Sequence, residues 1–217
     1  MAMGELTAID VLIHPDDSML ARAASVNQRM LQSVPPPQGF ALDEHHQPHI
    51  TVLQRYISTA DLDAVYDAIN AVLAAVDLAT LAFTAVAVRH MEVGGHPGVG
   101  LSGIVVKPGP EVLDFQNRLI DALAPFTGSG GTADAYVRTD AEPEINTATI
   151  DYIEHYVPAH SGQNYIAHVT VGLATLDDLG TIEAEPFEPL TFLPAGVSVY
   201  QLGNNGTAAK RLKNWAV

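Results

Sequence analysis

The spacing of apolar residues changes along the chain, from the period of strands in some segments to the period of helices in others. Residues 7–14 (TAIDVLIH) form an apolar run typical of a strand, and residues 18–32 place apolar side chains on one side of a helix that Asp16 and Asp17 can cap. The same reasoning predicts strands at 48–57, 81–92, 101–107, 166–173 and 198–202, and helices at 59–76, at 147–156 and from Pro108–Pro110 to about residue 124. Strands and helices mix without strict βαβ alternation, which predicts an α+β fold with helices outside antiparallel-rich sheets.

Two of these predicted strands contain the same tetrapeptide pattern. PHITVL at 48–53 and AHVTVG at 167–172 share His-apolar-Thr-Val and lie about half the chain apart. We therefore expect a single domain, residues 1–217, made of two lobes that each carry one signature strand, at 49–51 and at 168–170. Internal duplication is a plausible origin, although identity outside the tetrapeptides is weak.

Side-chain alternation divides each tetrapeptide between two faces. In a strand, His49 and Thr51 share one face while Ile50 and Val52 share the other, and the second tetrapeptide follows the same rule. Each strand can thus seat an apolar pair in a core and offer an imidazole and a hydroxyl to the opposite side.

Two imidazoles and two hydroxyls around one bound group suit phosphoester cleavage. One of His49 and His168 can remove a proton from the attacking oxygen while the other protonates the leaving oxygen. Thr51 and Thr170 can donate hydrogen bonds to the non-bridging phosphate oxygens. This chemistry requires no metal and no cofactor.

HITV and HVTV resemble the two H-x-T signatures of the 2H phosphoesterase superfamily, which includes RNA 2′,3′-cyclic phosphodiesterases and 2′-5′ RNA ligase-like proteins. The resemblance implies a bilobal fold with pseudo-twofold symmetry, in which two sheets flank a central cleft. It also implies that His49 and His168 form the acid/base pair, that Thr51 and Thr170 bind phosphate, and that the product keeps its phosphate on the 2′ oxygen. The expected enzyme is a cyclic phosphodiesterase.

Net charge narrows the expected partners. With 10 Lys+Arg against 25 Asp+Glu, the chain carries −15 and shows no basic stripe of the kind that grips long nucleic acid. We expect a small cyclic nucleotide, an oligonucleotide end or a cyclic phosphate such as ADP-ribose cyclic phosphate, and a monomeric protein. The short basic cluster Lys210-Arg211-Lys213 is expected to solvate the chain end.

Composition also sets expectations about the compartment. No stretch approaches the roughly 18–20 consecutive apolar residues of a membrane span, so no membrane partner is expected. The first residues lack a secretory signal, which predicts a soluble, cytoplasmic protein, or a periplasmic or exported one if a leader has been removed. Cysteine is absent, which excludes disulfides and thiolate chemistry.

Several further side chains are candidate substrate contacts. Tyr165, Tyr56 and Tyr152 can stack on a base or donate to phosphate, although packing in the core or at a rim is an equal alternative for each. His46 can line the entrance of the site. Arg55 can reach a phosphate or form a surface salt bridge.

Two rival functions remain open from the sequence. The same fold can serve as a nucleotide- or phosphate-binding module with little turnover. Alternatively, His45, His46 and His49 can be read as a metal cluster of a metal-dependent hydrolase, although they lack an HExxH helix and an acidic partner at fixed spacing.

Overall fold

The strands form two antiparallel sheets in a computed structural model that describes residues 5–43, 46–92, 97–140 and 142–216. The first four-stranded sheet has the order β2-β1-β7-β8, and the second has the order β5-β4-β3-β6. Their bounds are β1 Leu6–Pro15, β2 Ile50–Ser58, β3 Phe83–Glu92, β4 Val99–Pro108, β5 His168–Thr175, β6 Leu190–Phe192, β7 Pro194–Leu202 and β8 Ala208–Ala216. The predicted α+β class is confirmed.

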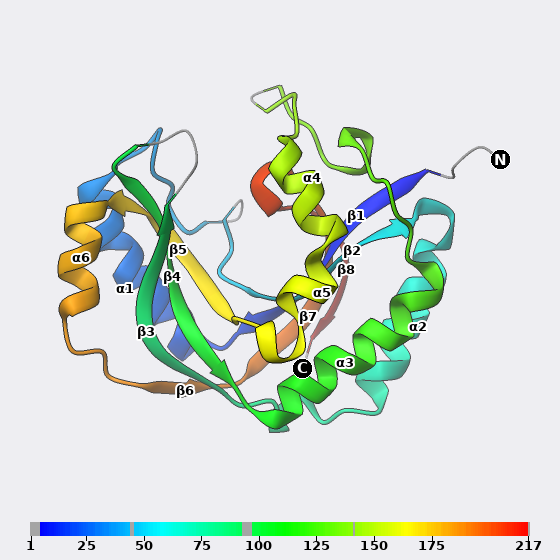
Figure 1. Cartoon of the computed structure of the whole chain (residues 1–217). Coiled ribbons are helices and arrows are strands. Elements are labelled where there is room, and N and C mark those ends of the chain that lie inside the picture. The colour runs from blue at the N-terminus through cyan, green and yellow to red at the C-terminus, as the bar shows by residue number, and fades with distance from the viewer. Residues whose placement is uncertain (1–4, 44–45, 93–96, 141, 217) are drawn as a thin grey trace.

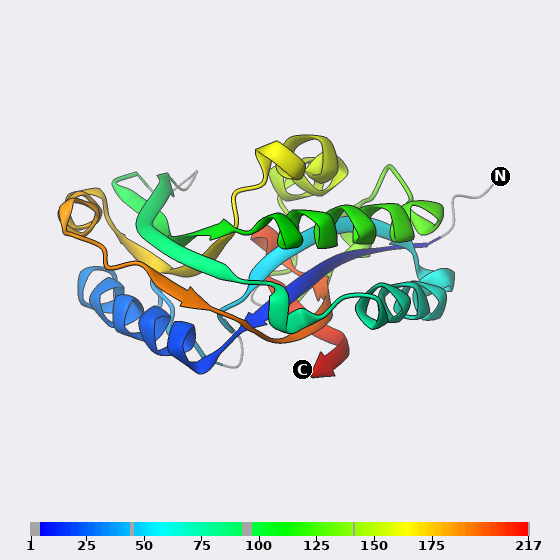
Figure 2. The same cartoon turned by 90° about the horizontal axis from the view of Figure 1, so that it is seen from below.

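Helices cover the outer sides of the two sheets (Figure 1). Their bounds are α1 Asp17–Ser33, α2 Leu62–Ala74, α3 Pro110–Leu123, α4 Thr147–Glu154, α5 Tyr156–His160 and α6 Leu176–Ala184. Figure 2 shows α1 and α6 at one end of the molecule and α2 and α3 at the other, while α4 and α5 contact β2.

Helices α1 and α3 each leave the sheet in which their preceding strand lies. Helix α1 follows β1 of the first sheet but packs on β5 of the second, and α3 follows β4 of the second sheet but packs on β2 of the first. The α1 N-terminus is capped as predicted, because Asp16 accepts hydrogen bonds from the backbone N–H groups of Ser18 and Met19. This exchange of helices ties the two halves of the chain together.

Four elements were absent from the sequence prediction: α5, α6, β6 and β8. Strand β8 contains Lys210, Arg211 and Lys213, which therefore lie exposed on an edge strand rather than on a solvated tail. Edge strands commonly carry basic side chains because these discourage pairing with another chain, and such a strand lacks the apolar alternation that identifies a buried one. No described helix is long and apolar enough to cross a membrane.

Candidate functional site

Both signature strands lie at the edge of a sheet, β2 in the first and β5 in the second. His49 directly precedes β2, and His168 is the first residue of β5. Residues of β2 and β5 approach to within 8 Å between their Cα atoms, although they belong to different sheets. The fold therefore brings the two tetrapeptides into one region of the molecule.

Burial along the two tetrapeptides follows the predicted alternation. The apolar residues Ile50, Val52, Val169 and Val171 are fully buried. On the other face, His49, Thr51 and Thr170 are half-buried and His168 is exposed. The imidazole and hydroxyl groups are thus accessible, while their apolar neighbours anchor the strands in the core.

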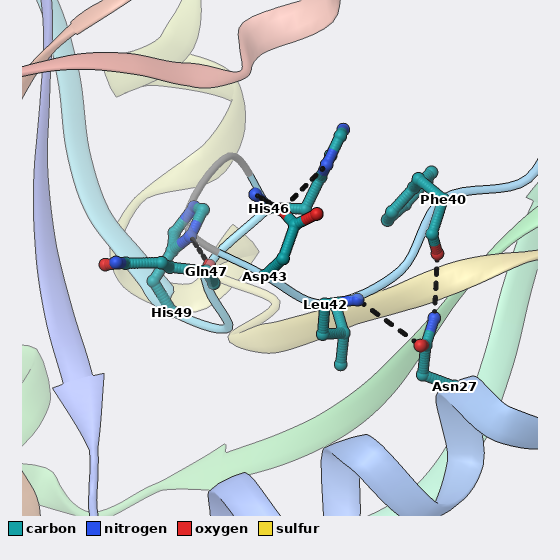
Figure 3. Close-up of polar contacts among 7 residues, drawn as sticks. All are labelled: Asn27, Phe40, Leu42, Asp43, His46, Gln47 and His49. Atoms are coloured by element: carbon teal, nitrogen blue, oxygen red, sulfur yellow. Dashed lines mark hydrogen bonds and ion pairs between the residues drawn. The ribbon is translucent and has the colours of Figure 1, made fainter.

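The two imidazoles make the same hydrogen bond to the backbone. Nδ1 of His49 lies 2.7 Å from the carbonyl oxygen of Gln47 (Figure 3), and Nδ1 of His168 lies 3.0 Å from that of Ile166. A carbonyl only accepts, so Nδ1 carries a proton in both rings and each Nε2 stays available. A neutral ring can then accept a proton at Nε2, and a protonated ring can donate one.

A β-bulge interrupts β2 directly after Thr51. Leu12 pairs with Thr51 and Val11 with Leu53, so Val52 is an extra residue in the ladder. The bulge reverses the alternation, and Gln54 consequently shares the face of Thr51.

Arg55 is turned to the opposite side by the same bulge. Its Nη1 atom donates to the carbonyl oxygen of Ile120 and to Oγ1 of Thr127, at 3.1 and 2.8 Å. Burial lowers the pKa of this guanidinium. Arg55 therefore fastens β2 to the end of α3, on the side of the strand opposite Thr51.

Strand β5 carries a bulge at the equivalent position. Gly103 pairs with Thr170 and Ser102 with Gly172, so Val171 is the extra residue. Gly172 has φ +137°, and a Cβ atom there would lie 3.1 Å from Nδ2 of Asn27. A glycine is required because the backbone angle disfavours other residues and α1 approaches closely.

A buried carboxamide binds the carbonyl oxygen of each bulge residue. Gln116 of α3 donates from Nε2 to the oxygen of Val52 at 2.9 Å, and Asn27 of α1 donates from Nδ2 to the oxygen of Val171 at 2.8 Å. Both side chains are at most 4% exposed. The irregular backbone of each bulge is thereby satisfied away from water.

Each carboxamide also holds the loop that leads to the other signature strand. Asn27 binds the oxygen of Phe40 at 3.0 Å and the N–H of Leu42 at 3.3 Å, in the segment before β2 (Figure 3). Gln116 Oε1 accepts from the N–H of Gly162 at 2.9 Å, in the segment before β5. The two amides thus couple the halves in opposite directions.

Asp10 of β1 lies next to the first tetrapeptide and is fully buried. Its Oδ2 atom is hydrogen-bonded to Thr51 Oγ1 at 2.8 Å and to Gln54 Nε2 at 3.0 Å. Burial raises the pKa of this carboxyl group, while the charge of His49, the hydrogen bonds from Gln54 and Thr51, and finally the charge of His168 oppose the rise. Both imidazoles are therefore within electrostatic reach of one carboxyl group.

His14 extends the polar surface beside His49. It follows Ile13, which pairs with Ile50 across β1 and β2, and its Nε2 lies 2.7 Å from Ser198 Oγ. Burial lowers the pKa of His14, and the nearby charges of His49 and Arg211 lower it further. His14 is thus favoured in its neutral form.

Among the tyrosine candidates, Tyr165 and Tyr56 use their hydroxyl groups inside the protein. Tyr165 donates to the carbonyl oxygen of Thr51 at 2.8 Å and so ties the segment before β5 to β2. Tyr56 is hydrogen-bonded to Tyr136 and to the oxygen of Ile150 within a separate apolar cluster. The structure therefore favours, for both Tyr56 and Tyr165, the packing alternative over the substrate contact.

Tyr152 and His46 are more accessible. Tyr152 of α4 is 42% exposed, packs against His160, and has its pKa raised by burial and by the charge of Asp10. His46 stacks on Phe40, and in Figure 3 its ring lies on the side of Phe40, away from His49. Tyr152 thus remains the better-placed candidate for a substrate contact.

The predicted signature residues line neither of two hollows on the protein surface. One, of about 370 Å³, lies between the end of α2 and the start of α3, and the other, of about 230 Å³, lies between β3 and α6. Among the described residues, no group of three His, Asp or Glu side chains is arranged to hold a metal ion. His45 of the metal hypothesis lies outside the described residues.

Sequence reasoning missed Asp10, Asn27 and Gln116. Each is a polar residue inside an otherwise apolar pattern: Asp10 in the run of β1, and the two amides on the buried stripes of α1 and α3. A buried polar side chain needs a hydrogen-bond partner, so such interruptions are the signal that could have identified them.

Comparison with known proteins supports the fold. No protein-family model matches the chain, and no curated protein matches it in sequence. The crystal structure of TT0787 of Thermus thermophilus is similar, with a TM-score of 0.55 and 12% identity over 97% of each chain. A crystal structure of a phosphoesterase aligns with a TM-score of 0.46 and 15% identity over 98% of this chain and 99% of that one, a similarity too low to support an argument. The chain therefore shares the fold of TT0787 over nearly its whole length.

Proposed function

We propose that this protein is a phosphoesterase that opens a small 2′,3′-cyclic phosphate or a related cyclic phosphodiester. His49 and His168 act as its acid/base pair, and Thr51 and Thr170 bind the phosphate. The observation that carries the proposal is the matched geometry of the two imidazoles, each fixed through Nδ1 to the carbonyl two residues earlier. Both rings also lie within electrostatic reach of Asp10, which supports a shared site.

The reaction needs one neutral and one protonated imidazole. The neutral ring takes a proton from water at Nε2 as the water oxygen bonds to phosphorus. The protonated ring gives its Nε2 proton to the ribose oxygen whose bond to phosphorus breaks, which leaves a phosphate monoester. The two proton transfers together restore the starting charge of the pair with the roles of the rings exchanged.

Hydrolysis of 2′,3′-cyclic nucleotides in excess chelator tests this proposal against its rivals. Turnover that survives the chelator supports the two-histidine mechanism. Binding without turnover supports a nucleotide- or phosphate-binding module of the same fold. Turnover that the chelator abolishes supports a metal-dependent hydrolase and contradicts the proposal.

A further inference from the structure

Asp10 combines burial with incomplete hydrogen bonding. Within the described part of the chain, the buried side-chain oxygens without a hydrogen-bond partner are Oδ1 of Asp10 and Oε1 of Gln54, two residues that pair across β1 and β2. An ionised carboxylate in this position would leave a charged oxygen buried without a donor, which costs far more than a neutral carbonyl in the same place. The geometry thus favours a proton on Asp10.

The groups that face Asp10 do not compensate a full negative charge by direct contact. The nearest polar partners are the Thr51 hydroxyl and the Gln54 amide, both uncharged, and their hydrogen bonds lower the pKa of Asp10 by less than burial raises it. The titratable groups that sense its charge from the surrounding elements are His49, His168, Tyr152, Tyr156 and Tyr165, and its paired residue on β7 is Tyr200. The two histidines are the cationic candidates in this group, and they oppose the burial effect without cancelling it.

The protonation state of Asp10 decides what Thr51 can offer to a ligand. If Asp10 is ionised, the Thr51 hydroxyl donates its proton to Oδ2 and presents only lone pairs to an anion. If Asp10 is protonated, its own O–H donates across the same 2.8 Å contact to Thr51 Oγ1. The Thr51 proton is then free to donate to a phosphate oxygen.

We propose that Asp10 is a positioning residue that stays protonated in the substrate-bound protein and turns the Thr51 hydroxyl proton toward the phosphate. This inference rests on the proposed function, because it assumes a phosphate at Thr51. The second half of the protein has no carboxyl group equivalent to that of Asp10. Leu101 and Leu173 occupy the positions equivalent to Asp10 and Gln54. Among the described residues, Thr170 Oγ1 has no hydrogen-bond partner that could capture its proton.

The variants Asp10→Asn and Asp10→Ala separate hydrogen bonding from charge. Asparagine can donate to Thr51 Oγ1 and cannot ionise, so we expect KM for 2′,3′-cyclic AMP to stay close to the unmodified value. Alanine removes both the acceptor that can capture the Thr51 proton and the donor that orients it, so this hydroxyl becomes like that of Thr170 and KM should change by no more than a few-fold. Leu101→Ala, at the equivalent position of the second half, is the matched control for the loss of side-chain volume.

The pH dependence of KM distinguishes this positioning role from a purely structural one. In the unmodified protein, KM should rise at alkaline pH as Asp10 loses its proton and recaptures the Thr51 hydroxyl. Asp10→Asn should abolish this rise while its other pH dependence persists. An unchanged alkaline limb in Asp10→Asn, with the protein folded and active, would overturn the proposal.

Two measurements do not depend on turnover. The infrared difference spectrum between the unmodified protein and Asp10→Asn at pH 7 should contain the C=O band of a carboxylic acid, and a carboxylate band alone would contradict the proposal.

The pH dependence of stability is the second measurement. The folded-state pKa of Asp10 is raised, so the folded protein binds a proton that the unfolded chain releases. Stability should therefore fall as pH rises from the ordinary Asp range through the raised value. Asp10→Asn should lack this fall.

These results distinguish the two proposals from each other. A carboxylic acid band and a pH-dependent stability, without turnover of any cyclic phosphate, would contradict the proposed function. They would still show that Asp10 is protonated. Turnover with a carboxylate band and a pH-independent difference in stability would support the function and refute the role of Asp10.

Discussion

The two signature strands share their geometry but differ in the pair of residues next to each tetrapeptide. Each has a histidine whose Nδ1 binds a backbone carbonyl, a bulge at the valine after the threonine, and a buried carboxamide that binds the carbonyl of that valine. Next to the first tetrapeptide, Asp10 of β1 pairs with Gln54 of β2, whereas the equivalent pair in the second half is Leu101 of β4 and Leu173 of β5.

This contrast separates requirements of shape from requirements of charge. The shared features fix where each imidazole and hydroxyl lies, so any chemistry that uses both halves depends on them equally. The buried carboxyl group is present on one side only, so it can make the two halves unequal in proton transfer and phosphate binding. Variants that make the same change in both halves test the shared geometry. A difference between the two halves in the size of the effect tests the role of the buried carboxyl group.

The largest expected effect is the loss of either imidazole. His49→Ala and His168→Ala should each lower kcat by about 10²- to 10⁴-fold, because each removes one partner of the proton transfer. The double variant should lose little more than either single one, since the two groups act as a unit. Steady-state rates on 2′,3′-cyclic nucleotides measure all three.

His90→Ala provides the control for this series. His90 pairs with Glu183 of α6 at 2.7 Å and lies outside the candidate site. Its loss should leave kcat within a few-fold of the unmodified value. Full activity in either His49→Ala or His168→Ala, with the fold intact by circular dichroism, would show that the acid/base assignment is wrong.

The two carboxamides should have the next largest effect. Asn27→Leu and Gln116→Leu each leave a buried bulge carbonyl without its donor, which costs about 1–3 kcal/mol of unfolding free energy. Each should also slow turnover, because each amide holds the bulge of one signature strand and the loop before the other. Urea unfolding and steady-state kinetics test both effects.

Neighbouring exposed amides supply matched controls. Gln28→Leu and Asn117→Leu make the same kind of change one residue along the same helices, where the side chains are exposed. Their effect on stability should stay within about 0.5 kcal/mol. If only one of the two buried amides matters, the equivalence of the two halves fails.

Removing a tyrosine hydroxyl should produce the smallest effects. Tyr165→Phe deletes the hydrogen bond to the carbonyl of Thr51 and should reduce the unfolding free energy by about 0.5–1.5 kcal/mol. Tyr152→Phe should change stability less, because Tyr152 is 42% exposed. Thermal unfolding of the two variants side by side decides which tyrosine is structural.

Substrate affinity gives the complementary test of these tyrosines. Tyr152→Ala should raise KM for a cyclic nucleotide if the exposed ring stacks on the base, whereas Tyr165→Phe should leave KM nearly unchanged. The reverse result would place the substrate against Tyr165 and contradict its packing role.

The tetrapeptides and most of the elements were predictable because their signals are local. The apolar runs located β1 and α1 to within one or two residues, and the His-x-Thr repeat located the candidate site residues. Strand β8 was missed because an exposed edge strand has no apolar alternation to detect. The side of β2 on which Arg55 lies was not predictable, because a bulge depends on the register with β1, which alternation within β2 cannot reveal.

The sequence by itself determined which residues carry imidazoles and hydroxyls and which of their neighbours are buried, since a period of two along a strand follows from backbone geometry. Only the tertiary structure decided how the two strands are held together. The carboxamides of α1 and α3, the Tyr165 hydroxyl and the buried Asp10 act between segments 41 to 144 residues apart in the chain. Hydrogen bonds over such separations depend on which helix packs on which sheet, and no local pattern encodes that choice.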